Sequence, residues 1–462
     1  MPISRDPFVS LIQAALPELQ QEFSQLPPAD PLGGAPGELD AMAGVLAEVG
    51  SRMANNYPYF HPLYAGQMMK PPHPIARVAY AMGMWINPNN HSLDGGRASS
   101  RFELEAVGEI AAMFGWKEHL GHLTGGGTVA NLEALWVSGR LHAGKRIVAS
   151  SQAHYTHSRI SAVLGLAFSS IPVDRRGRMD LERLEEELRK GDVGTVVVTL
   201  GTTAIGSVDP LKRILQLRAK YGFRVHVDAA YGGYFKLVSN ISPEAATAFE
   251  AAGEAESIVI DPHKHGLQPY GCGCVLFRDP AVGIFYKHDS PYTYFSSSDL
   301  HLGEITLECS RAGAAAVALW ATQRLLPLAT DGEFARSLGR CRSACLALYA
   351  RLVADGRFVL PLEPELDILV WGVKAASLAE ASRLAQSIFD AAAKRDLHIA
   401  LVQLPLGLFS PGTWPDEDTA TTVTCLRSVL MKPEHLDWLD RIWEILCAAT
   451  EVSLGSPEYQ HL

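Results

Sequence analysis

The sequence predicts an α/β protein built around a mostly parallel β-sheet that helices cover on both faces. Short apolar runs rich in Val and Ile recur from about residue 101, and amphipathic segments separate them. Such runs are typical of strands buried on both faces, and their alternation with helices is typical of parallel sheets. With 47% hydrophobic and 19% charged residues, the 462-residue chain can bury a large core.

The first 55 residues are expected to be helical but interrupted. Phe8, Ile12, Ala15 and Leu19 recur at helical spacing, and the run PPADPLGGAPG then breaks the pattern. The segment 57–74 is broken too often by Pro to form one regular element.

Helices and strands are expected to alternate between residue 101 and about residue 327. The predicted helices are 102–114, 129–141, 181–188 and 211–221. The predicted strands are 147–149, 195–200, 225–227, 258–260 and 275–277. This alternation predicts one large domain.

Beyond Pro327 the pattern changes to a helix at 334–349, followed by apolar runs with helices between and after them. Those runs are 358–360, 368–373, 398–404 and 423–431. They predict a smaller α+β domain. The expected organisation is an N-terminal helical segment (1–55), a large domain (56–327) and a small C-terminal domain (328–462).

The composition excludes several classes of partner. Forty Lys and Arg against 50 Asp and Glu give a net charge of −10, so no basic surplus exists to neutralise nucleic-acid phosphates. No apolar run approaches the ~18 residues of a membrane span, and the N-terminus lacks the features of a signal peptide. Seven irregularly spaced cysteines do not form a disulfide framework. We expect a cytoplasmic protein with no nucleic-acid or membrane partner.

Lys264 is the first candidate for chemistry. The run DPHKHGLQPYGCG places it directly after an apolar strand, between two histidines and before a Gly-rich turn. A lone lysine at such a place is more often a solvated surface group. The alternative is an amine at the carboxyl edge of a parallel sheet, where open α/β folds bind ligands. Such an amine can form a Schiff base with a carbonyl group.

Asp228 and His154 also follow apolar strands. Asp228, in RVHVDAAYGG, lies 36 residues before Lys264. It is either a turn or helix-capping aspartate or a carboxylate that keeps a ring nitrogen protonated. His154, in SSQAHYTHSRI, is either a satisfied capping or core residue or an imidazole stacked on a planar ligand.

A glycine-rich loop opens the helix in HLTGGGTVANLEAL. Free backbone N–H groups and the helix dipole at this point could bind a phosphate, although a triple glycine can also be a flexible turn. The loop matches neither a P-loop nor G-x-G-x-x-G. A phosphate cradle, a carboxylate for a ring nitrogen, a stacking imidazole and an aldehyde-binding lysine together indicate a pyridoxal phosphate site.

These segments, in this order, resemble the group II pyridoxal-phosphate-dependent amino acid decarboxylases, which include aromatic-amino-acid, tyrosine and glutamate decarboxylases. HVDAAY (226–231) followed by PHK (262–264) is the most specific part of the resemblance. HPLYAGQM (61–68) and LECSRAGAAAVALW (307–320) extend it over about residues 50 to 450. The resemblance implies the pyridoxal-phosphate fold of type I, with a sheet of the seven-stranded type, and a homodimer.

The resemblance also implies roles for individual residues. Lys264 holds the cofactor as a Schiff base, Asp228 pairs with its ring nitrogen, and His154 stacks on the ring opposite Ala230. An L-amino acid then loses CO₂ through a quinonoid intermediate to give the amine. The other implied cofactor contacts are Gly126, Gly127, Thr128, Thr203 and His263.

Substrate binding and proton transfer are implied for residues farther along the chain. Arg427, in CLRSVLMKP, matches an arginine that binds the substrate carboxylate in some relatives, and His61 lies in the segment through which substrate enters. The polar segment 286–304 offers Tyr292, Tyr294 and His301, and a loop tyrosine of this kind protonates Cα in the family. These aromatic residues could instead pack at a dimer interface.

Several alternatives stay open. An aminotransferase or a carbon–carbon or carbon–sulfur lyase can use the same fold, and an inactive cofactor-binding protein would be expected to have lost Lys264 or Asp228. His263, His265, Cys272 and Cys274 do not make a metal site, because no second ligand pair has a useful spacing. Asp261 departs from relatives that have asparagine there, and an acid beside a phosphate must point away or be paired. The substrate is not readable from the sequence.

Overall fold

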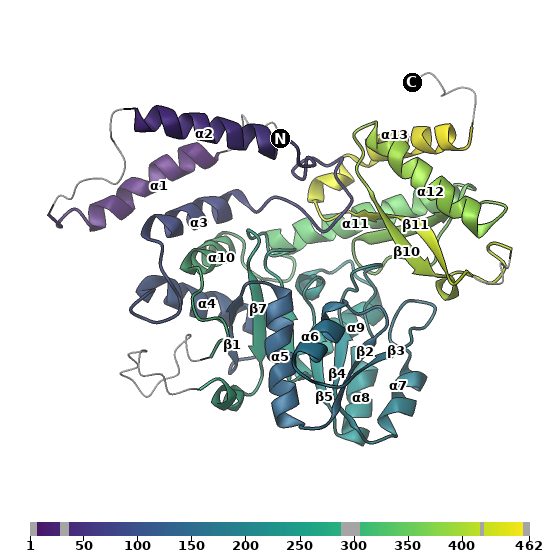
Figure 1. Ribbon diagram of the computed structural model, residues 1–462, viewed down its shortest axis with the longest axis horizontal. Coiled ribbons are helices and arrows are strands. Elements are labelled where there is room, and N and C mark those ends of the chain that lie inside the picture. The colour runs from purple at the N-terminus through teal and green to yellow at the C-terminus, as the bar shows by residue number, and fades with distance from the viewer. Residues whose placement is uncertain (1–6, 28–36, 288–304, 416–419, 456–462) are drawn as a thin grey trace.

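The computed structural model describes residues 7–27, 37–287, 305–415 and 420–455, and the statements below concern these residues (Figure 1). Within them the chain forms an N-terminal helical segment, a large seven-stranded sheet with its helices, and a second, four-stranded sheet with its own helices. The predicted boundary at 327/328 falls between α10 (Gly313–Leu325) and α11 (Glu333–Ala354).

The large sheet has the strand order β1-β7-β6-β5-β4-β2-β3. Only β7 is antiparallel to its neighbours β1 and β6, so the predicted mostly parallel sheet is confirmed. Its strands are β1 (Leu120–Thr124), β2 (Arg146–Ser150), β3 (Phe168–Ile171), β4 (Val193–Thr199), β5 (Arg224–Asp228), β6 (Ser257–Ile260) and β7 (Gly273–Phe277). The sequence did not predict β1 and β3.

Helices cover both faces of this sheet. Val197 packs in a cluster with side chains of α5 and α6, and Val259 and Val275 pack in another with α5. The next residues along the strands, such as Val198 and Ile260, belong to a large cluster with the helices of the other face. The helices are α4 (Arg97–Met113), α5 (Gly127–Leu141), α6 (Thr156–Val163), α7 (Leu181–Leu188), α8 (Leu211–Tyr221) and α9 (Pro243–Ala251).

The C-terminal part contains an antiparallel sheet with the order β10-β11-β9-β8. Trp371 is fully buried and packs in a separate core with Leu348, Ile388 and Leu446 from the three helices of this part. The elements are β8 (Phe358–Val359), β9 (Ile368–Val373), β10 (Ala400–Pro405), β11 (Thr422–Val429), α11, α12 (Leu378–Ala393) and α13 (Leu439–Ser453). This smaller α+β unit is the one that the sequence predicts.

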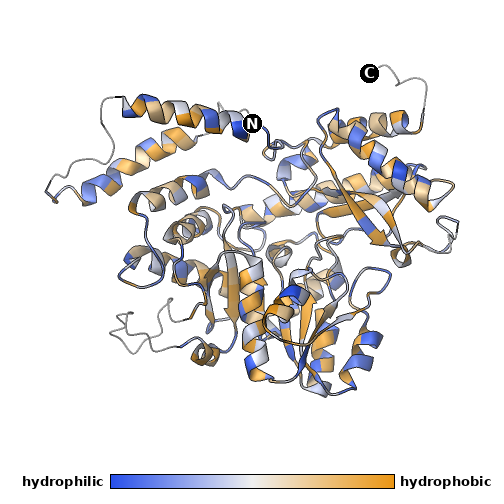
Figure 2. Ribbon diagram, viewed as in Figure 1, coloured by the Kyte–Doolittle hydropathy of each residue, from blue (hydrophilic) through white to orange (hydrophobic). Residues whose placement is uncertain are grey.

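The N-terminal helices α1 (Phe8–Glu22) and α2 (Glu38–Met53) bury no residue of their own. They lie away from the body of the molecule in Figure 1, and α3 (Pro74–Ile86) links them to it. Apolar side chains such as Leu39, Val45 and Leu46 are exposed on α2, and Figure 2 shows apolar stretches along both helices. None of the helices described combines the length and apolarity needed to cross a bilayer.

Candidate active site

The carboxyl ends of three parallel strands meet at one edge of the large sheet. Thr199 at the end of β4 pairs with Asp228 at the end of β5, and Asp228 pairs with Val259 of β6. The loops that follow these strands therefore lie side by side, together with the turn between β1 and α5. They enclose a cavity of about 310 Å³. Its lining includes the predicted residues Gly126, Gly127, Thr128, His154, Thr203, Asp228, Ala230, His263 and Lys264.

The glycine loop forms one end of the cavity. Gly126 has φ +145° and ψ 172°, a conformation essentially restricted to glycine. A Cβ atom on Gly127 would lie 2.6 Å from Oδ2 of Asp261, so the two segments approach too closely for a side chain. The N–H groups of Gly127 and Thr128 begin α5 and have no acceptor within the helix. Together with the helix dipole they can bind an anion such as a phosphate.

Asp228 is buried, and His157 is its closest partner. Nε2 of His157 lies 2.7 Å from Oδ2 of Asp228, and the Ala230 N–H donates to Oδ1 at 3.1 Å. Burial alone would raise the pKa of Asp228, but the hydrogen bond and charge of His157, followed by the charge of Lys264, outweigh it. The pKa therefore lies well below its ordinary value, and the carboxylate is ionised.

Asn131 ties Asp228 to the glycine loop. Its side-chain amide donates to the carbonyl of Gly127 at 2.9 Å and to Oδ2 of Asp228 at 3.4 Å. Its carbonyl oxygen accepts from Nε2 of His226 at 2.8 Å, and burial lowers the pKa of His226 to about 3. His226 is thus a neutral donor. This chain fixes Asp228 relative to the first turn of α5.

Lys264 forms an ion pair with Asp261. The Nζ atom of Lys264 lies 3.1 Å from Oδ2 of Asp261, which is itself 3.6 Å from Nε2 of His263. The aspartate beside the glycine loop is therefore paired. His263 also donates from Nδ1 to the Cys272 carbonyl at 2.8 Å, and burial lowers the pKa of its imidazole.

His154 presents an uncharged ring to the cavity. The Thr156 N–H donates to Nδ1 of His154 at 3.2 Å, and burial lowers the pKa of the imidazole. Thr203 and Ala230 line the same cavity. A neutral aromatic ring beside the buried carboxylate of Asp228 suits a planar cationic ring.

Arg427 and His61 do not line the cavity. The buried guanidinium of Arg427 donates to the carbonyls of Thr203 (2.7 Å), Ala204 (2.9 Å) and Gly66 (3.3 Å). It therefore lies behind the Thr203 loop and joins it to the N-terminal segment. The His61 ring packs edge-on against Trp438, with 4.8 Å between ring centroids.

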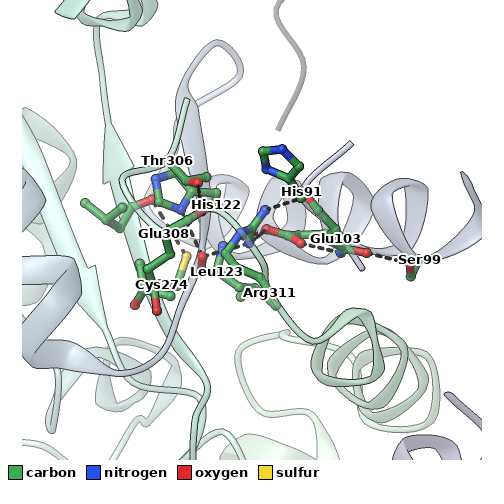
Figure 3. Close-up of polar contacts among 12 residues, drawn as sticks. His91, Ser99, Glu103, His122, Leu123, Cys274, Thr306, Glu308 and Arg311 are labelled. Atoms are coloured by element: carbon green, nitrogen blue, oxygen red, sulfur yellow. Dashed lines mark hydrogen bonds and ion pairs between the residues drawn. The ribbon is translucent and has the colours of Figure 1, made fainter. Parts of the chain in front are cut away.

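Tyr292, Tyr294 and His301 lie outside the described residues, but the segment that follows them contacts the glycine loop. Figure 3 shows Glu308 and Arg311 of this segment, with Arg311 beside Glu103 and Leu123. Glu308 accepts from the Gly125 N–H at 2.8 Å. Arg311 pairs with the buried Glu103 and donates to the Leu123 carbonyl at 2.9 Å, at the end of β1.

The small domain contacts the cavity wall through Asp367. The Tyr231 hydroxyl, in a residue that lines the cavity, donates to Oδ1 of Asp367 at 2.6 Å. Oδ2 of Asp367 lies 3.3 Å from Nε2 of His265, the residue after Lys264. One carboxylate thus holds both segments that carry cavity residues.

Sequence reasoning did not assign roles to His157, Asn131, Glu308 or Asp367. The signal for two of them was local: His157 lies in the first turn of α6, and Asn131 follows Gly127 by four residues. Cys272 and Cys274 are buried, with thiol pKa values raised by burial. No three metal-ligating side chains gather among the residues described.

Residues 58–374 match the family described as "Pyridoxal-dependent decarboxylase conserved domain". The chain belongs to the pyridoxal-dependent decarboxylase family. The decarboxylase is 27% identical over 471 residues to L-tyrosine decarboxylase of Enterococcus faecium, covering 77% of each chain. It is 28% identical over 375 residues to a probable L-tyrosine/L-aspartate decarboxylase of Methanothrix thermoacetophila, covering 80% of this chain and 89% of that one. It spans only 63% and 57% of the L-tyrosine decarboxylases of Enterococcus faecalis and Levilactobacillus brevis.

Solved structures share the fold of this decarboxylase. Oryza sativa TDC with PLP and tryptamine superposes with a TM-score of 0.76 at 17% identity, covering 98% of this chain and 99% of that one. Catharanthus roseus tryptophan decarboxylase in complex with L-tryptophan gives a TM-score of 0.75 at 14% identity with the same coverage. The predicted fold class, family, carboxy-lyase class and pyridoxal phosphate cofactor are confirmed.

The cavity fits this cofactor. Gly126 and the first N–H groups of α5 can hold the phosphate, Lys264 supplies an amine, and Asp228 is an ionised carboxylate. Oγ1 of Thr199 and Oδ1 of Asp261 are buried without a hydrogen-bond partner among the described residues, and both residues line the cavity. Such orphaned polar atoms are expected where a ligand supplies the missing partner.

Proposed function

We propose that this decarboxylase converts an L-amino acid into the corresponding amine, with Lys264 as the residue that binds the cofactor aldehyde. The observation that carries the proposal is the convergence of Lys264, Asp228 and the start of α5 on one cavity at the carboxyl edge of the sheet. Amine, carboxylate and anion-binding helix end are the three groups that pyridoxal phosphate requires of a protein.

Each residue has a distinct task in this proposal. Pyridoxal phosphate supplies an electron sink for the bond between Cα and the substrate carboxylate. Asp228, kept ionised by His157, holds a proton at the ring nitrogen, which strengthens that sink. His154 stacks on the ring, the N–H groups of Gly127 and Thr128 bind the phosphate, and Thr203, Ala230 and His263 complete the walls.

The proton for Cα is proposed to come from Tyr292 or Tyr294. The family resemblance supports this role. His301 lies in the same segment and is the remaining candidate acid.

Arg427 is proposed to bind the substrate carboxylate. Its guanidinium donates to the carbonyl of Thr203, a residue of the cavity lining. Because its hydrogen bonds go to carbonyls and to Gln67, binding a carboxylate would require it to exchange one of them. His61 is proposed to act farther out, where substrate enters.

We propose L-tyrosine as the first substrate to test. The names of the relatives from Enterococcus faecium and Methanothrix thermoacetophila point to L-tyrosine and L-aspartate. Tyr57, Tyr59 and Tyr64 form an aromatic group at and just before the segment implied for substrate entrance (61–68), with the Tyr59 and Tyr64 rings 4.8 Å apart. This group favours an aromatic or apolar side chain only slightly, because it also packs against its own neighbours.

We propose that the enzyme is a cytoplasmic homodimer, divided at 1–55, 56–327 and 328–462. The support for a dimer is the unburied pair α1 and α2, whose exposed apolar side chains need a cover. A second copy of the chain is the cover that the family resemblance implies.

The experiment is product analysis by mass spectrometry after incubation of the pyridoxal-phosphate-loaded enzyme with twenty L-amino acids. We expect a product lighter than its substrate by one CO₂ with the amino group retained. A keto acid or an aldehyde as the main product would refute the proposal in favour of transamination or oxidative chemistry. Lys264→Ala, which removes the amine, is the control and should give no product.

A further inference from the structure

A second cavity, of about 320 Å³, lies where the N-terminal segment, the loop after Lys264 and the small domain meet. Lys70 and Lys432 line it, together with His265 and Cys341. Pro71, Phe334 and Leu338 contribute apolar walls. None of these residues takes part in the chemistry proposed above.

Burial lowers the pKa of both lysines, to about 7 for Lys432, so each ammonium group is held in the protein at a cost. Nζ of Lys432 donates to the Tyr64 carbonyl at 2.5 Å, and Nζ of Lys70 donates to the Met431 carbonyl at 3.2 Å. Neither ammonium group forms an ion pair with a carboxylate in the part of the chain that the structure describes. Lys432 is only 4% exposed. A buried ammonium group without a counter-ion is costly, and an anion in the cavity would relieve that cost.

Each ammonium group has three N–H donors, and one of them is used by a backbone carbonyl. Lys70 donates to Met431, the residue before Lys432, and both lysines line the same cavity, so their ammonium groups act on one another. The remaining donors can therefore serve one shared acceptor.

His265 adds an independent sign of a missing partner. The residue is 1% exposed and lines the cavity, and its Nδ1 atom has no hydrogen-bond partner among the described residues. Its other nitrogen faces Asp367 at 3.3 Å. A buried ring nitrogen without a partner is expected where a ligand or water completes the site.

The thiol and imidazole neighbours of Lys432 add no charge to the inner wall. Burial raises the pKa of the Cys341 thiol and lowers the pKa of His435 to about 3, so both are neutral near pH 7. Burial also lowers the pKa of His61. The remaining charged neighbours of Lys432 are Lys70 and Glu434.

The acidic residues of the cavity are on its exposed side. Glu333 and Glu434 line it but are solvent-exposed, whereas Lys432 is buried. Water screens the two carboxylates more effectively than the buried ammonium groups. The buried carboxylate of Asp367, whose charge raises the pKa of Lys70, already accepts from Tyr231 and faces His265, so the donors left for a ligand are those of the two lysines.

We propose that this cavity binds a small oxyanion, a carboxylate or a phosphate group, between the ammonium groups of Lys70 and Lys432. The site is separate from the glycine loop and does not depend on decarboxylase activity. The buried pair, rather than the exposed glutamates, sets the sign of the ligand.

The test is isothermal titration of the pyridoxal-phosphate-loaded enzyme with acetate and, separately, with inorganic phosphate. Loading the cofactor fills the glycine loop, so added phosphate cannot bind there. We expect one site per chain, and the tighter of the two anions identifies the ligand class. If neither acetate nor phosphate binds, the proposal is overturned.

Three variants locate the site. Lys70→Met and Lys432→Met keep an apolar stem but remove the charge, and each should weaken binding at least tenfold. Lys236→Met is the matched control, because Lys236 is also partly buried and donates to a backbone carbonyl, that of Phe249, at 3.1 Å. Lys236 does not line this cavity. Equal binding by all three variants would overturn the proposal.

A structural readout does not depend on the stability of the variants. Crystals of the wild-type holoenzyme soaked in selenate should show an anomalous peak between Lys70 and Lys432. A cavity without selenium, in crystals that bind selenate elsewhere, would refute the assignment even if the lysine variants fail to fold.

Discussion

Gly127→Ala is expected to weaken cofactor binding through a steric conflict with Asp261. The added Cβ would lie 2.6 Å from Oδ2 and 2.9 Å from Oδ1 of that carboxylate. Asp261 cannot move freely, because it is 2% exposed and paired with Lys264 at 3.1 Å. Either the ion pair or the first turn of α5 must shift.

Overpacking a well-packed site costs about 1–3 kcal/mol, and this cost sets the expected change in cofactor affinity. At about 1.4 kcal/mol per tenfold change, the Kd for pyridoxal phosphate should rise roughly 5- to 150-fold. Gly127 has no positive φ, so alanine strains no dihedral angle, and its better helix propensity offsets part of the cost in the free protein. The free protein can relieve the conflict by shifting the first turn of α5, whereas phosphate binding needs the unshifted turn, so the cost should appear in cofactor affinity.

The assay is a titration of the cofactor-free protein with pyridoxal phosphate, followed by absorbance. Gly108→Ala is the control, because a Cβ at this glycine of α4 would meet no atom within 4 Å, and its Kd should be unchanged. Gly127→Ala combined with Asp261→Ala should recover part of the affinity. An unchanged Kd in Gly127→Ala would show that Gly127 and Asp261 do not approach closely enough to exclude a side chain.

Three further predictions concern charge and proton transfer. Asp228→Asn should lower kcat by at least about tenfold, because the ring nitrogen loses its ionised partner and the activation free energy rises by more than about 1.4 kcal/mol. Pre-steady-state kinetics should show that the slowed step is CO₂ release. Tyr292→Phe or Tyr294→Phe should slow protonation of Cα or raise the share of aldehyde; if neither changes rate or product ratio in product analysis, the acid lies elsewhere. Burial lowers the pKa of Lys432 from 10.5 to about 7, so the folded state binds fewer protons than the unfolded state between about pH 7 and 10. In anion-free buffer, the unfolding free energy of wild type relative to Lys432→Met should rise with pH across that window, by up to about 1.4 kcal/mol per pH unit. Chemical denaturation measures this difference, and a difference that does not change with pH would contradict the prediction.

The main site residues were predictable because parallel strands end at one edge of a sheet. Lys264, Asp228 and His154 each follow an apolar run, and the strand order of the structure places those ends around one cavity. The same reasoning located the glycine loop at the start of a helix. These inferences need only local patterns and a general property of α/β folds.

Two strands escaped prediction for physical reasons. β1 pairs with β7, which lies about 150 residues later in the chain, and its sequence LGHLT runs directly into the glycine loop. β3 is an edge strand with the sequence FSSI, of which only Ile171 is fully buried. Neither has the continuous apolar pattern of the central strands.

The supporting contacts of the site could not be read from the sequence. Asp367 meets Tyr231 across 136 residues, and Glu308 meets Gly125 across 183. The first pair depends on how the large and small domains pack, and the second joins two distant segments of the large domain. The structure places Arg427 behind the Thr203 loop instead of in the cavity lining, so its role in binding the substrate carboxylate stays a prediction.

We propose that Lys264 binds the cofactor in the cavity beside Asp228. The most direct measurement is borohydride reduction of the holoenzyme, followed by proteolysis and mass spectrometry of the modified peptide. We expect a reduced pyridoxyl group on Lys264 and none in Lys264→Ala. A pyridoxyl group on another lysine of the wild-type enzyme would contradict it.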